Sequence, residues 1–229
     1  MKIVRLGNTE SHLLLISFIL RYGNEPNKTK KQLSKILQSF VNWLYTTSGY
    51  YDKSVPGTKF NFDQRAFNPN FFKFINHLEM SVGNAEASQI YLGNNMNGLF
   101  NKYKNAFIKK YNISNLERLN GIRFFDRKQK IFDFMENKKI LVISSFDGLI
   151  KKQFESGNVY NIFEHFPKIK SLKTYKFPYC FLNNGPHNNY HETLEVVFNE
   201  IKNLDFDLVL LGCGCYGHML CHKIDSELK

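Results

Sequence analysis

The first candidate for chemistry is the segment RLGNTE at residues 5–10. It places the carboxamide of Asn8 and the carboxylate of Glu10 two positions apart, directly after a short apolar run. Oxygen ligands of this kind suit a divalent metal that holds a diphosphate group. The alternative is structural, with Asn8 capping a following helix and Glu10 lying in its first turn. Because such caps are common, the spacing alone favours the structural interpretation.

A second candidate is the segment GCGCYG at residues 212–217, which has the spacing G-x-G-x-x-G. Glycines at these positions allow a tight turn and let a phosphate approach the start of the next helix. A dinucleotide site also needs an acidic residue on a second strand ~20 residues later, and no such strand pattern follows. A packing turn, or a phosphate-facing turn of another kind, is therefore favoured.

Metal-ligand residue types are concentrated near the same turn, at Cys213, Cys215, His218, Cys221 and His222. A structural zinc site needs four convergent ligands, usually from two separate knuckles. These five residues fall within one short stretch, mostly on one expected helix, so small buried cysteine side chains are the favoured interpretation. The three cysteines of this stretch and Cys180 are expected to be reduced thiols rather than a disulfide framework.

His187 and His191 lie in a polar stretch with Asn188, Asn189 and Tyr190. They could serve as acid–base groups or as phosphate contacts. The favoured interpretation is that they are ordinary loop residues that lead into a helix.

The N-terminal half must position the first of these segments. Residues 2–6 read as a short strand, and helices are expected at about 9–22, 29–46, 71–78 and 94–110. In the second of these helices the apolar residues recur at helical spacing on one face. They are Leu33, Ile36, Leu37, Phe40, Val41 and Leu44.

The C-terminal half alternates strands and helices. Apolar runs at 138–146, 171–179 and 206–217 predict strands, and helices are expected at 147–154 and 190–203 and from Tyr216 onward. We therefore expect a single α/β domain over residues 1–229, with a Rossmann-like, mostly parallel sheet flanked by helices. Residues 25–137 would be largely a helical insertion, and 138–229 the Rossmann-like strand–helix units. Ligands of such sheets bind beyond the carboxyl ends of the strands, here at Ser144–Ser145 and Gly212–Gly217. Gly7 and Asn8 join them if the first strand belongs to the same sheet.

Composition sets broad limits. Hydrophobic residues make up 43% of the 229 residues, which is enough for a folded core, and the net charge is +11. Such a charge favours anionic partners, including nucleic acid, although an ordinary solvated surface also accounts for it. The apolar run from Leu13 to Leu20 is too short to span a bilayer, so a cytoplasmic protein without a transmembrane segment is expected. The residues of a possible polyanion-binding face are Lys102, Lys104, Lys109, Lys110, Arg118, Arg123, Arg127, Lys128 and Lys130.

Three segments together resemble a family of bacterial and viral proteins associated with GT-D-fold glycosyltransferases and polysaccharide biosynthesis. They are RLGNTE at 5–10, KKILVISSFDGLIKKQF at 138–154 and FDLVLLGCGCYGHMLCHKI at 206–224. SGYY at 48–51 also fits the family pattern. About half of the chain is covered. The chain departs from the pattern at Asn8, where the family has Asp, and at Ser145, where it usually has Pro.

The resemblance implies a transferase that moves a sugar from a nucleotide-diphosphate donor to a glycan or another acceptor. It places the divalent metal, manganese or magnesium, on Asn8 and Glu10, with Glu10 as the catalytic position. The donor would contact Arg5, Gly7 and Ser145 and the turn glycines Gly212, Gly214 and Gly217. The alternative is a non-catalytic α/β protein that binds nucleic acid or another polyanion through its basic face.

Overall fold

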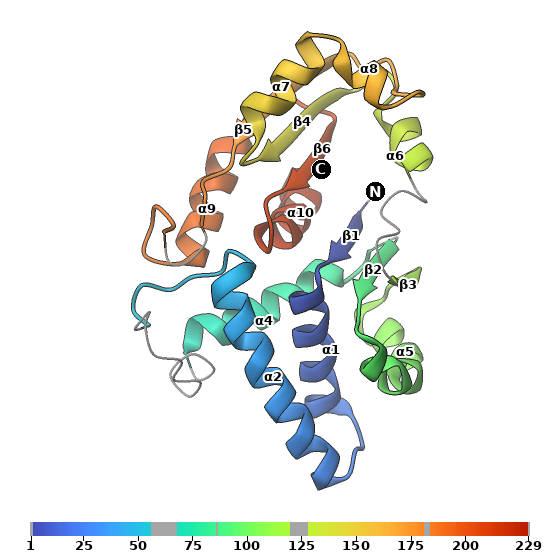
Figure 1. Cartoon of the computed structure of the whole chain (residues 1–229), viewed down its shortest axis with the longest axis vertical. Helices are drawn as coiled ribbons and strands as arrows, with labels where there is room; N and C mark the ends of the chain where they lie inside the picture. Colours follow the sequence, from blue (N-terminus) through green and yellow to red (C-terminus); the bar gives the residue numbers. More distant parts are fainter. Residues whose placement is uncertain (1, 56–67, 86, 120–127, 181–183, 229) are drawn as a thin grey trace.

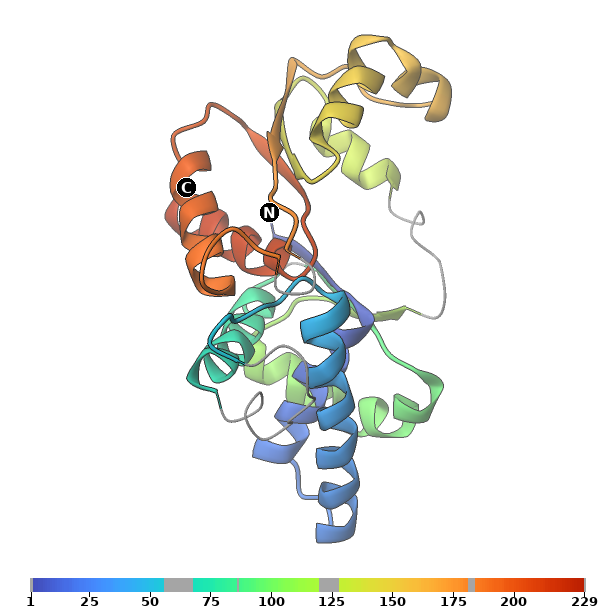
Figure 2. The ribbon, with the colours of Figure 1, turned by 60° about the vertical axis from the view of Figure 1, so that its left-hand side comes forward.

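The computed structural model describes residues 2–55, 68–85, 87–119, 128–180 and 184–228. Within these ranges the chain is an α/β protein with two parallel sheets of three strands each. Figures 1 and 2 show an elongated molecule with helix α2 (Asn27–Thr47) toward one end and the second sheet with helices α7 (Asp147–Glu155) and α8 (Asn158–Ile162) toward the other. The first sheet lies between them.

The first sheet has the order β1-β2-β3, with β1 at Ile3–Leu6, β2 at Ala87–Tyr91 and β3 at Leu116–Leu119. Its N-terminal strand is followed directly by α1, Asn8–Tyr22, which is buried along most of its length. Helices α2 (Asn27–Thr47) and α4 (Pro69–Val82) pack on α1. The short helix η1 (Asn94–Met96) and α5 (Asn97–Tyr111) connect β2 to β3.

The second sheet has the order β5-β4-β6, with β4 (Lys139–Ser144) between β5 (Ser171–Lys176) and β6 (Leu208–Gly212). Helix α6 (Lys128–Met135) precedes β4, and α7 (Asp147–Glu155) and α8 (Asn158–Ile162) follow it. Helix α9 (Tyr190–Ile201) connects β5 to β6, and α10 (Tyr216–Glu227) follows β6. Each connection returns the chain to a parallel strand, as the strand–helix alternation predicts.

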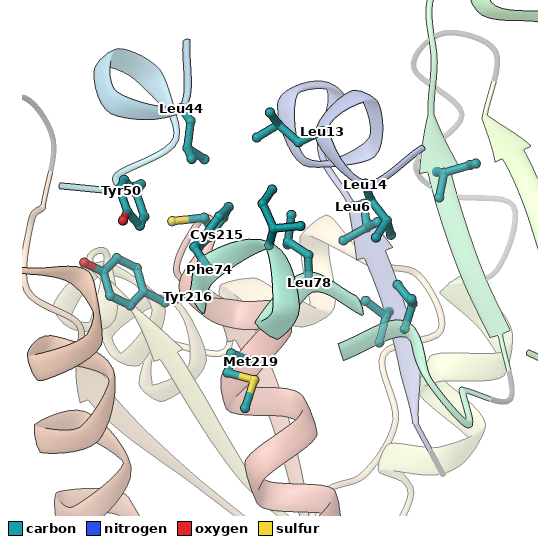
Figure 3. Close-up of a cluster of buried hydrophobic side chains, with 14 of the residues drawn as sticks. Leu6, Leu13, Leu14, Leu44, Tyr50, Phe74, Leu78, Cys215, Tyr216 and Met219 are labelled. Carbon is teal, nitrogen blue, oxygen red and sulfur yellow. The ribbon is translucent and has the colours of Figure 1, made fainter. Parts of the chain in front are cut away.

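One hydrophobic core joins the two sheets. It contains buried side chains from β1, α1, α2, α4 and α5 together with others from β4, α9 and α10. Figure 3 shows Leu6 of β1, Phe74 of α4 and Tyr216 of α10 in this core, with Tyr50 from the loop after α2. Helix α10 carries much of the connection, because it packs on both α4 and β1.

The predicted fold class is confirmed, and several boundaries are corrected. The strands after 138, 171 and 206 and the helices α1, α2 and α9 lie where the sequence patterns predict them. The helix expected at 71–78 extends from Pro69 to Val82. The segment 25–137 is largely helical in its described part, but it also contains β2 and β3, which the sequence analysis did not predict. The first strand pairs with these two and not with the C-terminal sheet. In the part of the chain that the structure describes, no helix combines the length and the apolar character needed to cross a membrane.

Two histidines make the fold sensitive to acid. Burial lowers the pKa of His218 to about 4, and burial together with nearby positive groups does the same for His77. Both pKa values lie below the value of ~6.5 expected in an unfolded chain, so the unfolded state binds more protons below pH ~6.5. The contribution of the two neutral histidines to stability is therefore fully present above pH ~6.5 and is lost as the pH falls toward 4.

We expect His218→Gln to reduce this acid sensitivity. Both side chains keep some solvent exposure, so we expect roughly 1–2 kcal/mol of pH-dependent stability from each. Urea unfolding at pH 7.5 and pH 4.0 measures the loss for the wild type and the variant. The variant should lose roughly 1–2 kcal/mol less than the wild type, and an equal loss in both would contradict a buried neutral His218.

Candidate anion site at two strand–helix turns

The turn between β1 and α1 holds a buried carboxylate. Glu10 is 5% exposed and lies in the first turn of α1, as the structural interpretation predicted. A Cβ atom at Gly7 would lie 2.5 Å from Oε2 of Glu10, so a side chain at position 7 would displace this carboxylate. Gly7, and not Asn8, is the N-cap residue, and no side chain caps the helix. The prediction that Asn8 caps α1 is therefore wrong, because the helix already begins at Asn8.

Ser48 connects this turn to the turn between β6 and α10. Its hydroxyl hydrogen-bonds to the carboxylate of Glu10. Its carbonyl oxygen accepts a hydrogen bond from the backbone N–H of Cys215, with 3.3 Å between nitrogen and oxygen. The same oxygen would be 3.0 Å from a Cβ atom at Gly214. The β1–α1 turn of the first sheet and the β6–α10 turn of the second therefore meet at one residue.

The electrostatics of this junction follow from burial. Burial raises the pKa of Glu10, and hydrogen bonds from its own backbone N–H and from Ser48 oppose that rise. Burial also raises the pKa values of Cys215 and Tyr190, and the nearby charge of Glu10 adds to both shifts. A carboxylate in such surroundings favours a compensating positive charge, which a bound cation would supply.

The glycines of the second turn have separate structural roles. Gly212 ends β6, and Gly214 has a φ of +59°, a conformation that favours glycine. Gly217 lies within α10, where a Cβ atom would contact Leu211 at 3.6 Å. Gly214 therefore meets the predicted requirement for a tight turn, whereas Gly217 serves the packing of α10 against β6.

The cysteines beside these glycines are buried in the core, as the sequence analysis favoured. Cys213 and Cys215 are 6% and 0% exposed, and both are free thiols, as are Cys180 and Cys221. Burial raises the pKa of Cys213, so this thiol stays protonated and is a poor nucleophile. Within the described ranges no group of three or more His, Cys, Asp or Glu side chains could hold a metal ion.

Ser145 lies at the end of β4, beside the second turn. The preceding residue, Ser144, is in register with Gly212 in the sheet. The hydroxyl of Ser144 accepts a hydrogen bond from the backbone N–H of Phe146 at 3.2 Å. Ser145 is half-buried in the turn between β4 and α7. It therefore shares an edge of the sheet with Gly212, as predicted, although no contact described joins it to Glu10.

Arg5 is not part of the buried junction. It lies on β1 between the buried residues Val4 and Leu6, and its side chain is exposed. Alternating residues of a strand point to opposite faces, so Arg5 faces away from the core that Leu6 enters. Partial burial lowers its pKa. The structure thus brings together Gly7, Glu10 and Gly214, with Gly212 and Ser145 at the adjoining sheet edge and Arg5 outside.

Asn8 and Glu10 carry oxygen atoms of the type that a hard divalent cation prefers, and both lie in the first turn of α1. The side-chain Oδ1 of Asn8 is buried and has no hydrogen-bond partner among the described residues. An unsatisfied buried acceptor needs a donor or a cation. Two protein oxygens alone do not complete a coordination shell, but magnesium is commonly bound by one or two protein ligands together with phosphate oxygens and water.

The structure also contains a polar pocket that the sequence analysis did not predict as a site. It measures about 450 Å³ and lies between α4 and the N-terminal part of α9. His187 and His191 line it, and both were candidates for acid–base or phosphate contacts. The two residues reach the same pocket because the turn at Asn189 begins α9 between them. Asn70 and Lys73 of α4 complete the opposite side, and no local sequence pattern linked them to the histidines.

The structure describes only some of the residues of the predicted basic face. Lys102 and Lys110 lie on α5, where Lys102 pairs with Glu25 and Lys110 lies over the ring of Tyr22 at 4.8 Å. Arg123 and Arg127 lie outside the described residues. A continuous basic stripe therefore stays a prediction.

Comparisons with known proteins add no family assignment: no protein-family model, no curated protein and no solved structure matches this chain.

Proposed function

We propose that this protein transfers a sugar from a nucleotide-diphosphate donor to a glycan or another hydroxyl-bearing acceptor. The observation that carries the proposal is the meeting of two strand–helix turns at Ser48, since parallel α/β sheets bind ligands beyond the carboxyl ends of their strands. A diphosphate placed there would contact the starts of α1 and α10 together.

The helix N-termini support a phosphate at this place. Helices α1, α7 and α10 each follow a parallel strand, and none of the three has a side-chain cap. By contrast, α4 and α9 are capped by Asn68 and Asn189. The helix dipole favours negative charge at such an N-terminus. At α10 the first backbone N–H groups already donate to carbonyl oxygens, that of Cys215 to Ser48 among them, so the support for a phosphate there is the field of the helix.

The residues of the two turns take the following roles in the proposal. Asn8 and Glu10 would hold a manganese or magnesium ion, which would supply positive charge against the leaving diphosphate. Gly7 and Gly214 let the Glu10 carboxylate and the Ser48 carbonyl pack closely against the backbone of the two turns. Ser145 and Gly212 extend the donor site along the edge of the second sheet. The dipoles of α1 and α10 would stabilise the charge that develops as the sugar–phosphate bond breaks.

Glu10→Gln tests this assignment by removing the charge while keeping the shape of the side chain. Thermal melting with UDP- and GDP-sugars, with and without manganese, measures donor binding. Ligand at 100 times its Kd stabilises a protein by about 2.7 kcal/mol, which is roughly 5–10 °C in Tm for a chain of this size. We expect that manganese-dependent rise in the wild type and no rise in Glu10→Gln.

The matched control is Glu79→Gln. Glu79 bonds to Arg21 in the last turn of α1, at 2.8 Å, whereas Glu10 lies in the first turn of the same helix. The two ends are about 16 Å apart at ~1.5 Å per residue, so this control should keep the full rise in Tm. Equal rises in Glu10→Gln and Glu79→Gln would place the nucleotide elsewhere.

A further inference from the structure

The pocket between α4 and α9 is built from polar side chains that other residues hold in place. The backbone N–H and side-chain Nδ2 of Asn188 donate to the carboxylate of Glu192, and these two hydrogen bonds lower its pKa. Oδ1 of Asn189 accepts the N-cap hydrogen bond from the backbone of Glu192 at 3.0 Å, which leaves the Asn189 amide nitrogen as a donor. Nδ2 of Asn70 donates to Asp52 at 2.7 Å, which leaves the side-chain oxygen of Asn70 as an acceptor.

Its two histidines are also fixed. Nε2 of His191 lies 2.8 Å from the carbonyl oxygen of Asn70, so this nitrogen carries the proton and Nδ1 is a bare acceptor. Nδ1 of His191 is buried and has no partner among the described residues, and burial lowers the pKa of this side chain, which keeps it neutral. Nδ1 of His187 lies 2.9 Å from the buried hydroxyl of Thr193, which also hydrogen-bonds to Tyr51.

The chemistry of the lining restricts the ligand. Two carboxylates, Glu192 and Glu195, line the pocket together with the ammonium group of Lys73. The lining therefore carries charges of both signs, which suits a neutral ligand that both donates and accepts hydrogen bonds. Seven of the eight lining residues are polar or charged, Val196 being the exception, and their carbon atoms form much of the pocket surface. A ligand with several hydroxyl groups on a carbon ring matches this combination of hydrogen-bonding groups and C–H surface.

We propose that this pocket binds a neutral polyhydroxylated compound, a sugar, through its hydroxyl groups. The volume of about 450 Å³ lies within the range of ~300–1,000 Å³ for small-molecule sites. Carboxylate and amide groups held rigidly by neighbours bind hydroxyls without a large ordering cost. The polar and open character of the pocket makes the binding weak.

The position of the pocket relates it to the two turns. The hydroxyl of Tyr51 accepts a hydrogen bond from the backbone N–H of His187 at the pocket, and Ser48 bonds to Glu10 at the turns. These two residues are three positions apart, a span of at most ~10 Å of chain. If sugar transfer is the function, the pocket lies on the acceptor side. The binding of a sugar itself rests only on the pocket.

Saturation-transfer NMR with the methyl glycosides of glucose, galactose, mannose and N-acetylglucosamine tests the proposal, without nucleotide or metal. Two variants remove ligand contacts while sparing the fold. Glu192→Gln removes the charge, and Asn189→Asp keeps the cap oxygen but removes the amide donor. The control, Glu200→Gln, changes an exposed carboxylate on the same helix.

At least one glycoside should bind the wild type and the control with equal affinity. Its affinity for each pocket variant should be about fivefold or more lower. Melting curves of the variants verify that they are folded. The proposal is overturned if no glycoside binds, if both pocket variants bind like the wild type, or if inorganic phosphate displaces the glycoside. Because no nucleotide is present, these outcomes leave the donor site to its own test.

Discussion

Replacing Tyr190 by alanine is expected to destabilise the protein by about 3–5 kcal/mol, the cost of removing a large buried aromatic side chain. Tyr190 is 1% exposed. Its ring centroid lies 4.4 Å from that of Tyr216, 5.1 Å from that of Phe74 and 5.3 Å from that of Tyr50. These partners come from α10, α4 and the loop after α2, so one ring joins elements from both halves of the chain.

Urea unfolding followed by circular dichroism measures this loss. Such a change consumes a large share of the ~5–15 kcal/mol that stabilises a typical domain, so Tyr190→Ala could unfold outright. Tyr190→Phe is the second variant, and it removes only the 3.4 Å hydrogen bond to the carbonyl of Cys215, at about 1 kcal/mol. Tyr160→Ala is the control, because Tyr160 is 48% exposed. A loss at Tyr190 no larger than at Tyr160 would contradict a core shared by the two halves.

Gly185→Ala is expected to cost about 2–3 kcal/mol through overpacking. A Cβ atom at position 185 would lie 2.0 Å from Cζ of Tyr51, and Tyr51 is 0% exposed. The ring cannot move into solvent without losing its hydrogen bonds to Thr193 and to the backbone N–H of His187. The substitution therefore disturbs both the core and the wall of the polar pocket.

A double-mutant cycle isolates this contact. In a Tyr51→Ala background the clash is absent, so Gly185→Ala should change the free energy of unfolding by less than about 0.5 kcal/mol. Gly148→Ala provides the matched control, since nothing lies within 4 Å of its added Cβ atom and alanine favours the helix. Equal effects of Gly185→Ala with and without the ring of Tyr51 would mean that the two residues do not touch.

The elements that the sequence predicted are those with strong patterns. The run ILVI of β4 and the run LVLL of β6 are continuous apolar stretches, and α2 has an apolar face of helical period. The strands that it missed, ASQIY at β2 and LERL at β3, are short and mix polar with apolar residues. Their strand conformation depends on pairing with β1, a long-range contact that a local pattern does not contain.

The candidate site was predictable in its parts but not in its assembly. The turns at Gly7 and Gly212 follow predicted strands, and their glycines indicated close backbone approach. The connection through Ser48 joins residues far apart in sequence, and it depends on how α2 ends against α10. The burial of Glu10 likewise results from tertiary packing, since its position in the first turn of a helix would leave it exposed in an isolated segment.

Calorimetric titration of a UDP-sugar with manganese into wild type, Glu10→Gln and Glu79→Gln tests the proposed donor site most directly. The proposal predicts manganese-dependent binding to the wild type and to Glu79→Gln, and at least a tenfold weaker Kd for Glu10→Gln, a loss of about 1.4 kcal/mol or more. Binding that needs no manganese and is unchanged in Glu10→Gln, or no binding of any nucleotide-sugar to the wild type, would contradict a donor site at the two turns.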